Sequence, residues 1–217
     1  MNILVIGDQQ NFIALERKGG LAAHTVERTD SLEGAEALQN RDLVIDLLFD
    51  AHPENAAVYA QYPAIPVLAG VVKTSLHSVN KTYGCTLIGC NWLPGFIDMP
   101  VTEISLLDAT QQPVLVAIMQ QLGWEYELVQ DAVGMVTPRV ICMIINEAYM
   151  AAETNTASRE DIDVAMKLGT NYPMGPFEWS KKIGIKEVYE VLAAVHTATG
   201  NERYAISELL EKEARNN

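Results

Sequence analysis

Two kinds of pattern divide this chain, and their order constrains the fold more than any other feature. Over residues 1–130, short aliphatic and β-branched runs alternate with helix-like segments, whereas residues 131–217 contain helical patterns only. Asn2–Ile6 and Asp42–Phe49 are almost continuously apolar, as expected of parallel strands buried on both faces. The alternation predicts a doubly wound, mainly parallel sheet with helices on both faces, followed by an all-α C-terminal domain.

The remaining elements follow from local signals. Five further strands are predicted at His24–Glu27, Pro66–Val72, Thr86–Cys90, Val101–Leu107 and Trp124–Val129. Helices are predicted at Gln111–Leu122 and at five places after the boundary: Arg139–Thr154, the segment that Ser158 and Asp161 open as a capping box and Gly169 closes, Pro176–Gly184, Lys186–Thr199 and Asn201–Ala214. In the first of these five, Ile141, Ile144, Ile145, Ala148 and Ala152 form the expected buried stripe.

Charge and composition exclude several partners. The chain has 15 basic and 28 acidic side chains, a net charge of −13, which disfavours nucleic acid and anionic membranes. No apolar run approaches the roughly 18 residues that span a bilayer. The apolar start lacks a cationic leader, so we expect no signal peptide and a cytoplasmic protein. The three cysteines and the histidines His24, His52 and His196 lack metal-ligand spacing, so no metal is expected.

The first strand runs into a turn where dinucleotide-binding folds place a G-x-G-x-x-G loop. Those glycines let the pyrophosphate approach the backbone and the helix approach the strand. Here the three positions are Gly7, Gln9 and Phe12, so only the first glycine is present. Asp30, predicted at the end of the second strand, stands where an acidic residue would bind a ribose hydroxyl, although a turn or cap role is the commoner one. The pattern indicates a Rossmann-like domain with an eroded nucleotide site.

The helical half contains the run Ala157–Glu178, ASREDIDVAMKLGTNYPMGPFE, which resembles the C-terminal domain of 3-hydroxyacyl-CoA dehydrogenases. Upstream, Asp42–Asp46, Val72–Leu76 and Ile88–Asn91 resemble a strand, an Asn-Thr-Ser-Ser-Leu loop and an Ile-Gly-x-His segment of that family. The resemblance therefore spans nearly the whole chain. It implies an NAD-type Rossmann domain at 1–130, a helical dimerisation domain at 131–217, a homodimer, and an acyl-CoA-like small molecule from fatty-acid metabolism as ligand.

The resemblance also places the family's catalytic residues. Family members pass hydride to NAD while a histidine, held by a glutamate, takes the hydroxyl proton. Asn91 stands at the histidine position and Glu103 at the glutamate position, while Thr74 replaces a serine and Pro138 replaces an asparagine. An amide has no pKa near 7 and cannot act as the base.

Two further points bear on function. The family's CoA-clamping helical hairpin is missing, because Asp30–Arg41 has room for one short helix only. A substitute base, Glu103 or His77, is one possibility. The plainer interpretations are that Glu103 is a hydrogen-bonded remnant and that His77 is a surface histidine at a helix start.

The apolar helix Arg139–Thr154, with Met143 and Met150, is interpreted as dimer core. Two hypotheses stay open: a dehydrogenase of this type in which NAD binding is doubtful, and a non-catalytic homodimeric binding or structural protein.

Overall fold

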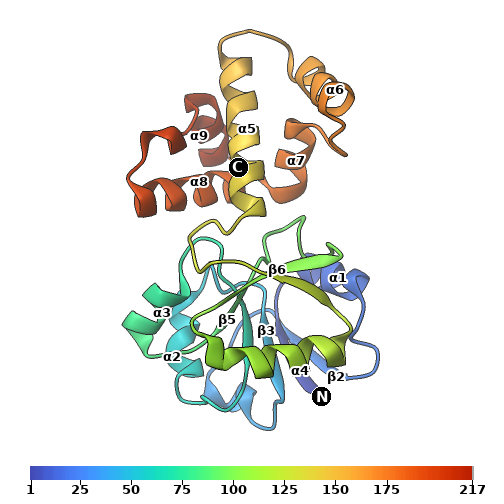
Figure 1. The fold of residues 1–217 in the computed structure, drawn as a ribbon, viewed down its shortest axis with the longest axis vertical. Coiled ribbons are helices and arrows are strands. Elements are labelled where there is room, and N and C mark those ends of the chain that lie inside the picture. The colour runs from blue at the N-terminus through green and yellow to red at the C-terminus, as the bar shows by residue number, and fades with distance from the viewer. Residues whose placement is uncertain (217) are drawn as a thin grey trace. The chain divides into compact units, whose positions relative to one another are not determined.

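The computed structural model describes residues 1–216 and consists of two units, Met1–Met135 and Val136–Asn217. The division falls five residues after the predicted boundary. The first unit is an α/β sheet unit and the second is entirely helical (Figure 1). None of the described helices has the length and hydrophobicity needed to cross a lipid bilayer.

The sheet unit contains one sheet of seven strands in the order β2-β1-β3-β4-β5-β6-β7. The strands are β1 (Asn2–Ile6), β2 (Thr25–Thr29), β3 (Leu43–Asp46), β4 (Val67–Gly70), β5 (Ile88–Cys90), β6 (Val101–Leu106) and β7 (Glu125–Leu128). All neighbours are parallel except β5 and β6, which are antiparallel. The predicted doubly wound, mainly parallel sheet is therefore confirmed. Most of the predicted strands are longer than the observed strands by a few residues.

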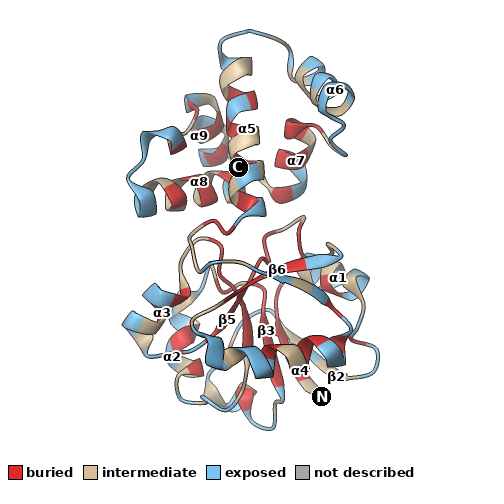
Figure 2. Ribbon diagram, in the orientation of Figure 1, coloured by how far each residue is buried: buried red, intermediate tan, exposed pale blue. Residues whose placement is uncertain are grey.

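Helices cover both faces of this sheet. The described helices of the unit are α1 (Gln9–Lys18), η1 (Ala35–Leu38), η2 (Pro53–Asn55), α2 (Ala56–Tyr59), α3 (Leu76–Tyr83), η3 (Ala109–Gln111) and α4 (Gln112–Leu122), where η marks a 3₁₀ turn. On one face, α1 and α4 pack against alternate residues of the central strands; on the other face, η1, α2 and α3 pack against the intervening residues. The central strands are buried along their length (Figure 2).

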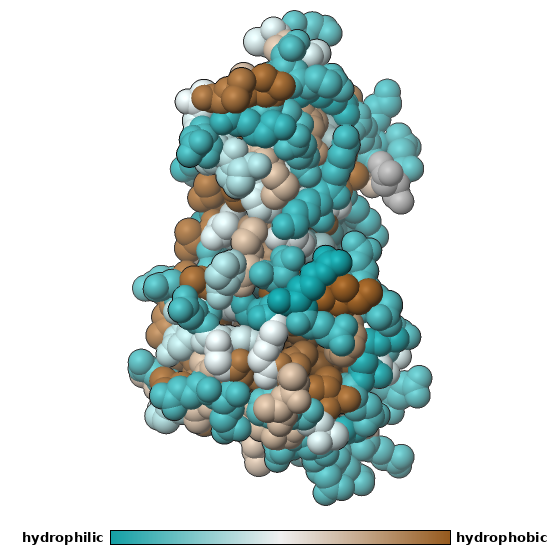
Figure 3. Space-filling model, turned by 90° about the vertical axis from the view of Figure 1, so that its right-hand side faces the viewer, coloured by the Kyte–Doolittle hydropathy of each residue, from teal (hydrophilic) through white to brown (hydrophobic). Residues whose placement is uncertain are grey.

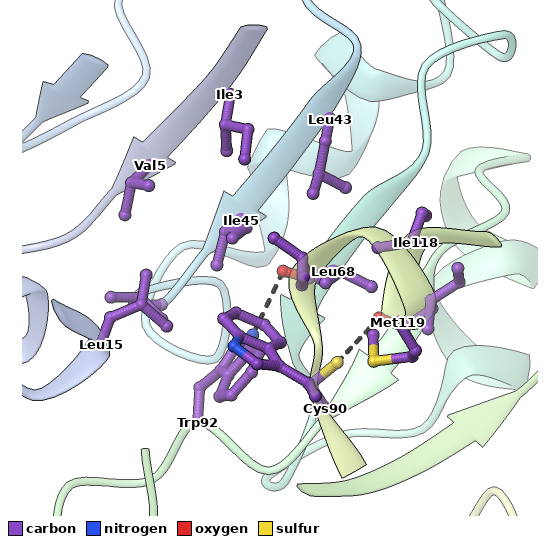
Figure 4. Close-up of a cluster of buried hydrophobic side chains, with 14 of the residues drawn as sticks. Ile3, Val5, Leu15, Leu43, Ile45, Leu68, Cys90, Trp92, Ile118 and Met119 are labelled. Atoms are coloured by element: carbon purple, nitrogen blue, oxygen red, sulfur yellow. Dashed lines mark hydrogen bonds between the residues drawn. The ribbon is translucent and has the colours of Figure 1, made fainter. Parts of the chain in front are cut away.

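The first of these two cores is shown in Figure 4. Ile3, Val5, Leu43 and Ile45 come from neighbouring strands and lie between the sheet and the helices. Trp92 is 2% exposed and its indole N–H donates to the Leu68 carbonyl, 3.3 Å away. This burial explains why β1 and β3 have continuous apolar sequences, since both faces are covered.

The helical unit consists of α5 (Thr137–Glu153), α6 (Arg159–Thr170), α7 (Pro176–Ile183), α8 (Ile185–Thr199), η4 (Glu202–Tyr204) and α9 (Glu208–Arg215). The single helix predicted at Asn201–Ala214 was wrong. The buried amide of Asn146 on α5 donates to the Ala205 carbonyl and accepts from the Ser207 N–H, at 2.8 and 2.9 Å. These bonds hold the backbone open between η4 and α9, and Ser207 then caps α9.

Two other helical predictions need correction. The predicted buried stripe of α5 is only partly right, because Ile141, Ile144 and Ala152 are half-buried. The buried face contains Cys142, Ile145, Asn146, Ala148 and Tyr149. Helix α6 continues one residue past Gly169 and ends at Thr170. Asn171, with a left-handed backbone, is its C-cap. Ser158 does accept from the Asp161 N–H, but the Asp161 carboxylate takes the Ser158 hydroxyl rather than completing a capping box.

Candidate functional site

The turn between β1 and α1 is where a dinucleotide pyrophosphate would sit in this fold. Asp8 caps α1: its carboxylate accepts the Asn11 backbone N–H at 2.8 Å and the Asn11 side-chain amide at 3.1 Å. The free N–H groups and the dipole of a helix N-terminus are what attract a phosphate in such folds. Here the protein's own carboxylate binds one of those donors and places a negative charge beside the rest.

Gly7, the one glycine of the loop that is present, lies against the Leu47 side chain. A Cβ added at Gly7 would lie 2.9 Å from Cδ1 of Leu47, which follows β3 and is 6% exposed. The Leu47 side chain therefore lies against the Cα of Gly7. Gln9, the first residue of α1, is exposed, and Phe12 packs against the core formed by residues of β1 and β3.

The prediction that Asp30 ends β2 was wrong, because the strand ends at Thr29. The Asp30 carboxylate is bound to the Arg28 guanidinium at 2.5 Å, and its side chain is 75% exposed. The same guanidinium nitrogen donates to the Gly7 carbonyl at 2.8 Å. Arg28 thus links the end of β2 to the β1–α1 turn, and Asp30 is occupied as its ion-pair partner.

Asp46, at the end of β3, is a fully buried carboxyl. It accepts from the Tyr59 hydroxyl at 2.7 Å, the Asn55 amide at 3.1 Å and the Leu48 N–H at 3.0 Å. Burial raises the pKa of Asp46, and these hydrogen bonds lower it in part. The network fixes the chain just after β3, and with it the position of Leu47 over Gly7.

Asn91 and Glu103 are joined by a backbone hydrogen bond. The Asn91 N–H donates to the Glu103 carbonyl at 3.0 Å, because β5 and β6 pair antiparallel. Asn91 is 4% exposed, and its side-chain oxygen accepts the Leu93 N–H at 3.3 Å. Glu103 is half-buried. The structure therefore places Asn91 and Glu103 at adjacent positions joined by a backbone hydrogen bond, and the Asn91 side chain is buried.

The loop that contains Thr74 is held by two carboxylates. Asp50 accepts the Val72 and Lys73 N–H groups at 2.7 and 2.8 Å. Asp131 accepts the Leu76 and His77 N–H groups, at 2.8 and 2.9 Å, at the start of α3. Thr74 lies half-buried between these anchored stretches. His77 is an exposed residue at a helix start, as the plainer interpretation had it.

Pro138 belongs to the other unit. It is buried in the first turn of α5, where its missing N–H costs no intrahelical hydrogen bond. The described residues contain no group of three or more His, Cys, Asp or Glu side chains that could hold a metal ion. All three cysteines are buried free thiols, and burial raises the pKa of Cys85 to about 11.

The β1–α1 turn offers fewer free donors to NAD than its usual pose uses. That pose uses backbone donors at the start of α1, and the Asp8 carboxylate binds one of them. Sequence reasoning missed Asp8, Arg28, Leu47, Asp50 and Asp131. Asp8 could have been found, since Asp followed by a helix is an N-cap signal. Asp131 could not, because 55 residues separate it from the N–H of Leu76.

Comparison with known proteins gives a consistent picture. A family model for the 3-hydroxyacyl-CoA dehydrogenase C-terminal domain matches residues 134–217. The 3-hydroxyadipyl-CoA dehydrogenase of Escherichia coli K12 is 40% identical over 96 residues, 44% of this chain and 20% of that protein. A probable 3-hydroxybutyryl-CoA dehydrogenase of Bacillus subtilis is 34% identical over 129 residues, 58% of this chain and 45% of that protein. The chain thus spans less than half the length of these curated relatives.

Solved structures agree at the level of the fold. An (S)-3-hydroxybutyryl-CoA dehydrogenase from Ralstonia eutropha matches with a TM-score of 0.76 and 20% identity, over 100% of this chain and 94% of that one. A 3-hydroxybutyryl-CoA dehydrogenase from Escherichia coli K12 matches with a TM-score of 0.61 and 28% identity, over 68% of this chain and 31% of that one.

Proposed function

We propose that this chain is a member of the 3-hydroxyacyl-CoA dehydrogenase family, whose C-terminal domain model matches residues 134–217, and that it keeps the family's fold without its hydride transfer to NAD. It acts as a non-catalytic, homodimeric binding protein whose ligand is a small molecule related to acyl-CoA. A cytoplasmic location and a place in fatty-acid metabolism are part of this proposal.

One observation carries the proposal: the Asp8 carboxylate binds the start of α1, where the cofactor's pyrophosphate would need the donors. A pyrophosphate placed there would lose a donor to a competing carboxylate and would meet its charge. Asn91 supports the same conclusion independently, since its buried amide cannot take a proton at neutral pH.

The test is titration of the protein with NADH, followed by thermal unfolding. A ligand at 100 times its dissociation constant stabilises a protein by about 2.7 kcal/mol. For a chain of this size that corresponds to a rise of roughly 5–10 °C in Tm. We expect no saturable rise up to millimolar NADH, with an active 3-hydroxybutyryl-CoA dehydrogenase shifting under the same conditions. A saturable rise would contradict the proposal.

A second candidate is a slow dehydrogenase in which Glu103 serves as the base. The backbone hydrogen bond between Asn91 and Glu103, which keeps the two positions adjacent, favours it. Oxidation of NADH with acetoacetyl-CoA would be measured for the wild type, Glu103→Gln and Asn91→His. The non-catalytic proposal expects background rates for the wild type and for both variants. Wild-type turnover that Glu103→Gln abolishes would establish the enzyme instead.

The homodimer is a separate part of the proposal, supported by the match of residues 134–217 to a domain that the family resemblance associates with dimerisation. Sedimentation velocity of the whole chain checks it: we expect a species of twice the 23.9 kDa chain mass. A monomer at all concentrations up to about 100 µM, well above typical dimer dissociation constants, would contradict the homodimer.

A further inference from the structure

Strand β2 (Thr25–Thr29) ends the sheet, and its outer side, which we call the β2 edge, carries backbone groups that point away from the sheet. Among residues 1–216, its one neighbouring strand is β1. Thr25 and Thr29 make backbone hydrogen bonds toward β1 and the turn after it, at 3.0 and 2.9 Å. Residues that bond to one neighbour alternate along a strand, so Glu27 also faces β1. The N–H and C=O groups of Val26 and Arg28 therefore face outward.

The two charged side chains of β2 are both paired within the chain. Glu27 binds the Arg41 guanidinium at 2.5 Å, and Arg28 binds the Asp30 carboxylate at 2.5 Å. These charges cancel, so the β2 edge has no net charge, although the chain as a whole has a net charge of −13. Charged side chains are a common protection of edge strands against pairing with another chain. On β2 this protection is weak, because each charge already has a partner.

The other end of the sheet, β7, differs in charge. Glu125 and Glu127 lie two residues apart, on the same face of the strand, and both are exposed. Two copies of β7 side by side would bring these carboxylates together, which is unfavourable. Hydrophilic side chains also cover much of the side of the molecule drawn in Figure 3, and two chains with a net charge of −13 repel each other. Of the two ends of the sheet, the β2 edge is the one at which charge opposes pairing least.

The sequence of β2, Thr-Val-Glu-Arg-Thr, has the register needed to pair with itself. In an antiparallel pair, opposite residues whose backbone groups face each other exchange both N–H···O bonds. A two-fold axis at Glu27 places Val26 of each copy opposite Arg28 of the other. This register uses the outward N–H and C=O groups of both residues in both copies. Thr25 then lies opposite Thr29, and such threonine pairs stabilise neighbouring strands.

The two Glu27 carboxylates at the axis are the position in this register where like charges meet. Like charges directly opposite each other destabilise a strand pair. Here the Arg41 side chain is 13% exposed and also donates to the Ala37 carbonyl and the Asn2 side chain, which fixes its guanidinium beside Glu27. Each carboxylate therefore approaches the axis together with its own cation, and the two ion pairs offset the repulsion.

We propose that the β2 edge pairs antiparallel with the β2 edge of a second copy and joins the two sheets into one. This surface belongs to the sheet unit, whereas the homodimer of the proposed function is assigned to the helical unit. Pairing through five residues is a small contact compared with the roughly 1,200–2,000 Å² of a stable interface. We therefore expect it at concentrations above those that form the homodimer, where it joins two homodimers into an assembly of four chains.

Amide hydrogen exchange of the full-length protein, followed by nitrogen-15 NMR, tests the pairing without a substitution. Spectra at about 50 µM and about 1 mM protein bracket the concentrations at which a weak contact forms. We expect the Val26 and Arg28 amides to exchange roughly tenfold or more slowly at the higher concentration, because pairing gives both N–H groups an acceptor. The Glu27 amide, which faces β1, should exchange slowly at both concentrations.

The outward amides of β7 are the matched control. The Val129 N–H donates to the Ile104 carbonyl at 2.8 Å, so the same alternation turns the N–H groups of Tyr126 and Leu128 away from the sheet. We expect their exchange rates to be equal at both concentrations, because the β7 edge does not pair.

A substitution at the β2 edge gives a second readout. Val26→Pro removes one outward N–H and leaves the ladder to β1 intact, and edge strands accept proline at such positions. Small-angle X-ray scattering at about 1 mM should give the mass of four chains for the wild type and of two chains for Val26→Pro. Leu128→Pro, at the matched position of β7, should keep four chains. Circular dichroism verifies that both variants are folded.

Each outcome separates this pairing from the proposed homodimer. Val26 and Arg28 amides that exchange equally fast at both concentrations would overturn the pairing and leave the homodimer standing. Equal slowing of Tyr126 and Leu128 would also overturn it, because general association would then explain the protection. A wild type that is monomeric when dilute and forms pairs of chains with Val26 and Arg28 protected would overturn the homodimer alone.

Discussion

The β1–α1 turn and the corner between α6 and α7 both place a carboxylate at the start of a helix, with different consequences. In the turn, Asp8 is the cap itself and binds Asn11 three residues later. At the corner, Asp163 reaches from α6 to the Phe177 N–H, and Glu178 accepts the Gly175 N–H at 2.9 Å. The first carboxylate caps only its own helix, whereas Asp163 joins two helices and Glu178 binds both the start of its own helix and Lys167 of α6.

The comparison explains where this chain keeps the pattern of its relatives. The matching run at Ala157–Glu178 holds Asp163 and Glu178, which connect α6 to α7 through the Phe177 N–H and Lys167, so contacts within the chain account for these two residues. The β1–α1 turn holds residues that would matter for a cofactor, and there Gly7 is explained by its contact with Leu47. In both regions, residues at positions that resemble the family make contacts within the chain itself.

The largest expected effect is at Gly175. A Cβ there would overlap the Asp163 side chain, so Gly175→Ala must displace Asp163 and disturb the contact between α6 and α7. We expect a loss of about 1–3 kcal/mol in the free energy of unfolding, measured with urea at fixed protein concentration. Gly169→Ala is the matched control, because a Cβ at Gly169 in α6 meets nothing within 4 Å. Alanine should stabilise that helix by up to about 1 kcal/mol. Equal effects at the two glycines would show that the corner is not tightly packed.

Removing either helix-capping carboxylate should lower the free energy of unfolding, and the loss should again be larger at the corner between α6 and α7. Asp163→Ala removes the bond to Phe177 and loosens the contact between two helices, so we expect a cost of about 1–2 kcal/mol. Asp8→Ala removes an exposed cap and should cost about 0.5–1 kcal/mol. Urea unfolding of both variants measures the difference. A larger cost at Asp8 would reverse the comparison between the two regions.

A smaller effect tests why Gly7 is glycine. Gly7→Ala brings a methyl group to within 2.9 Å of Leu47 Cδ1, a contact that a side-chain shift can relieve, so we expect a cost of about 1 kcal/mol. In a Leu47→Ala background, the same substitution should cost little, because the opposing side chain is gone. The double-mutant cycle gives the coupling directly. Additive costs would mean that Gly7 is glycine for a reason other than Leu47.

The smallest effect is a difference in titration between the two units. Burial raises the pKa of Asp46 above its ordinary 3.8, so its contribution to stability falls as pH rises from 3.8 to its folded-state pKa. Lys167 and the Gly175 N–H lower the pKa of Glu178 below 4.5, so its contribution is lost as pH falls below 4.5. Carbon-13 NMR of the side-chain carboxyls measures both pKa values, and shifts of the same sign would contradict the assignment.

The sequence predicted the fold well because most strands and helices have strong local signals. Asn2–Ile6 was predicted without error, since a buried strand next to a glycine turn is clear. The errors lie where a distant side chain decides. Asn146 interrupts the predicted last helix by bonding to Ala205, which is 59 residues further along the chain. The sequence pattern of a buried helix face consists of apolar residues, so it does not point to an asparagine in this role. The positions of Asn91 and Glu103 followed from the resemblance, but the partners of Asp50 and Asp131 did not, because only the folded chain brings them together.

The central claim is that the start of α1 does not receive a dinucleotide. Nitrogen-15 NMR of the backbone amides, during titration with NAD, tests it at the residues concerned. We predict that the amide signals of Gly7, Asp8 and Asn11 do not move up to millimolar NAD, since the Asp8 carboxylate already binds the Asn11 N–H at this helix start. Saturable shifts confined to these amides would contradict the account.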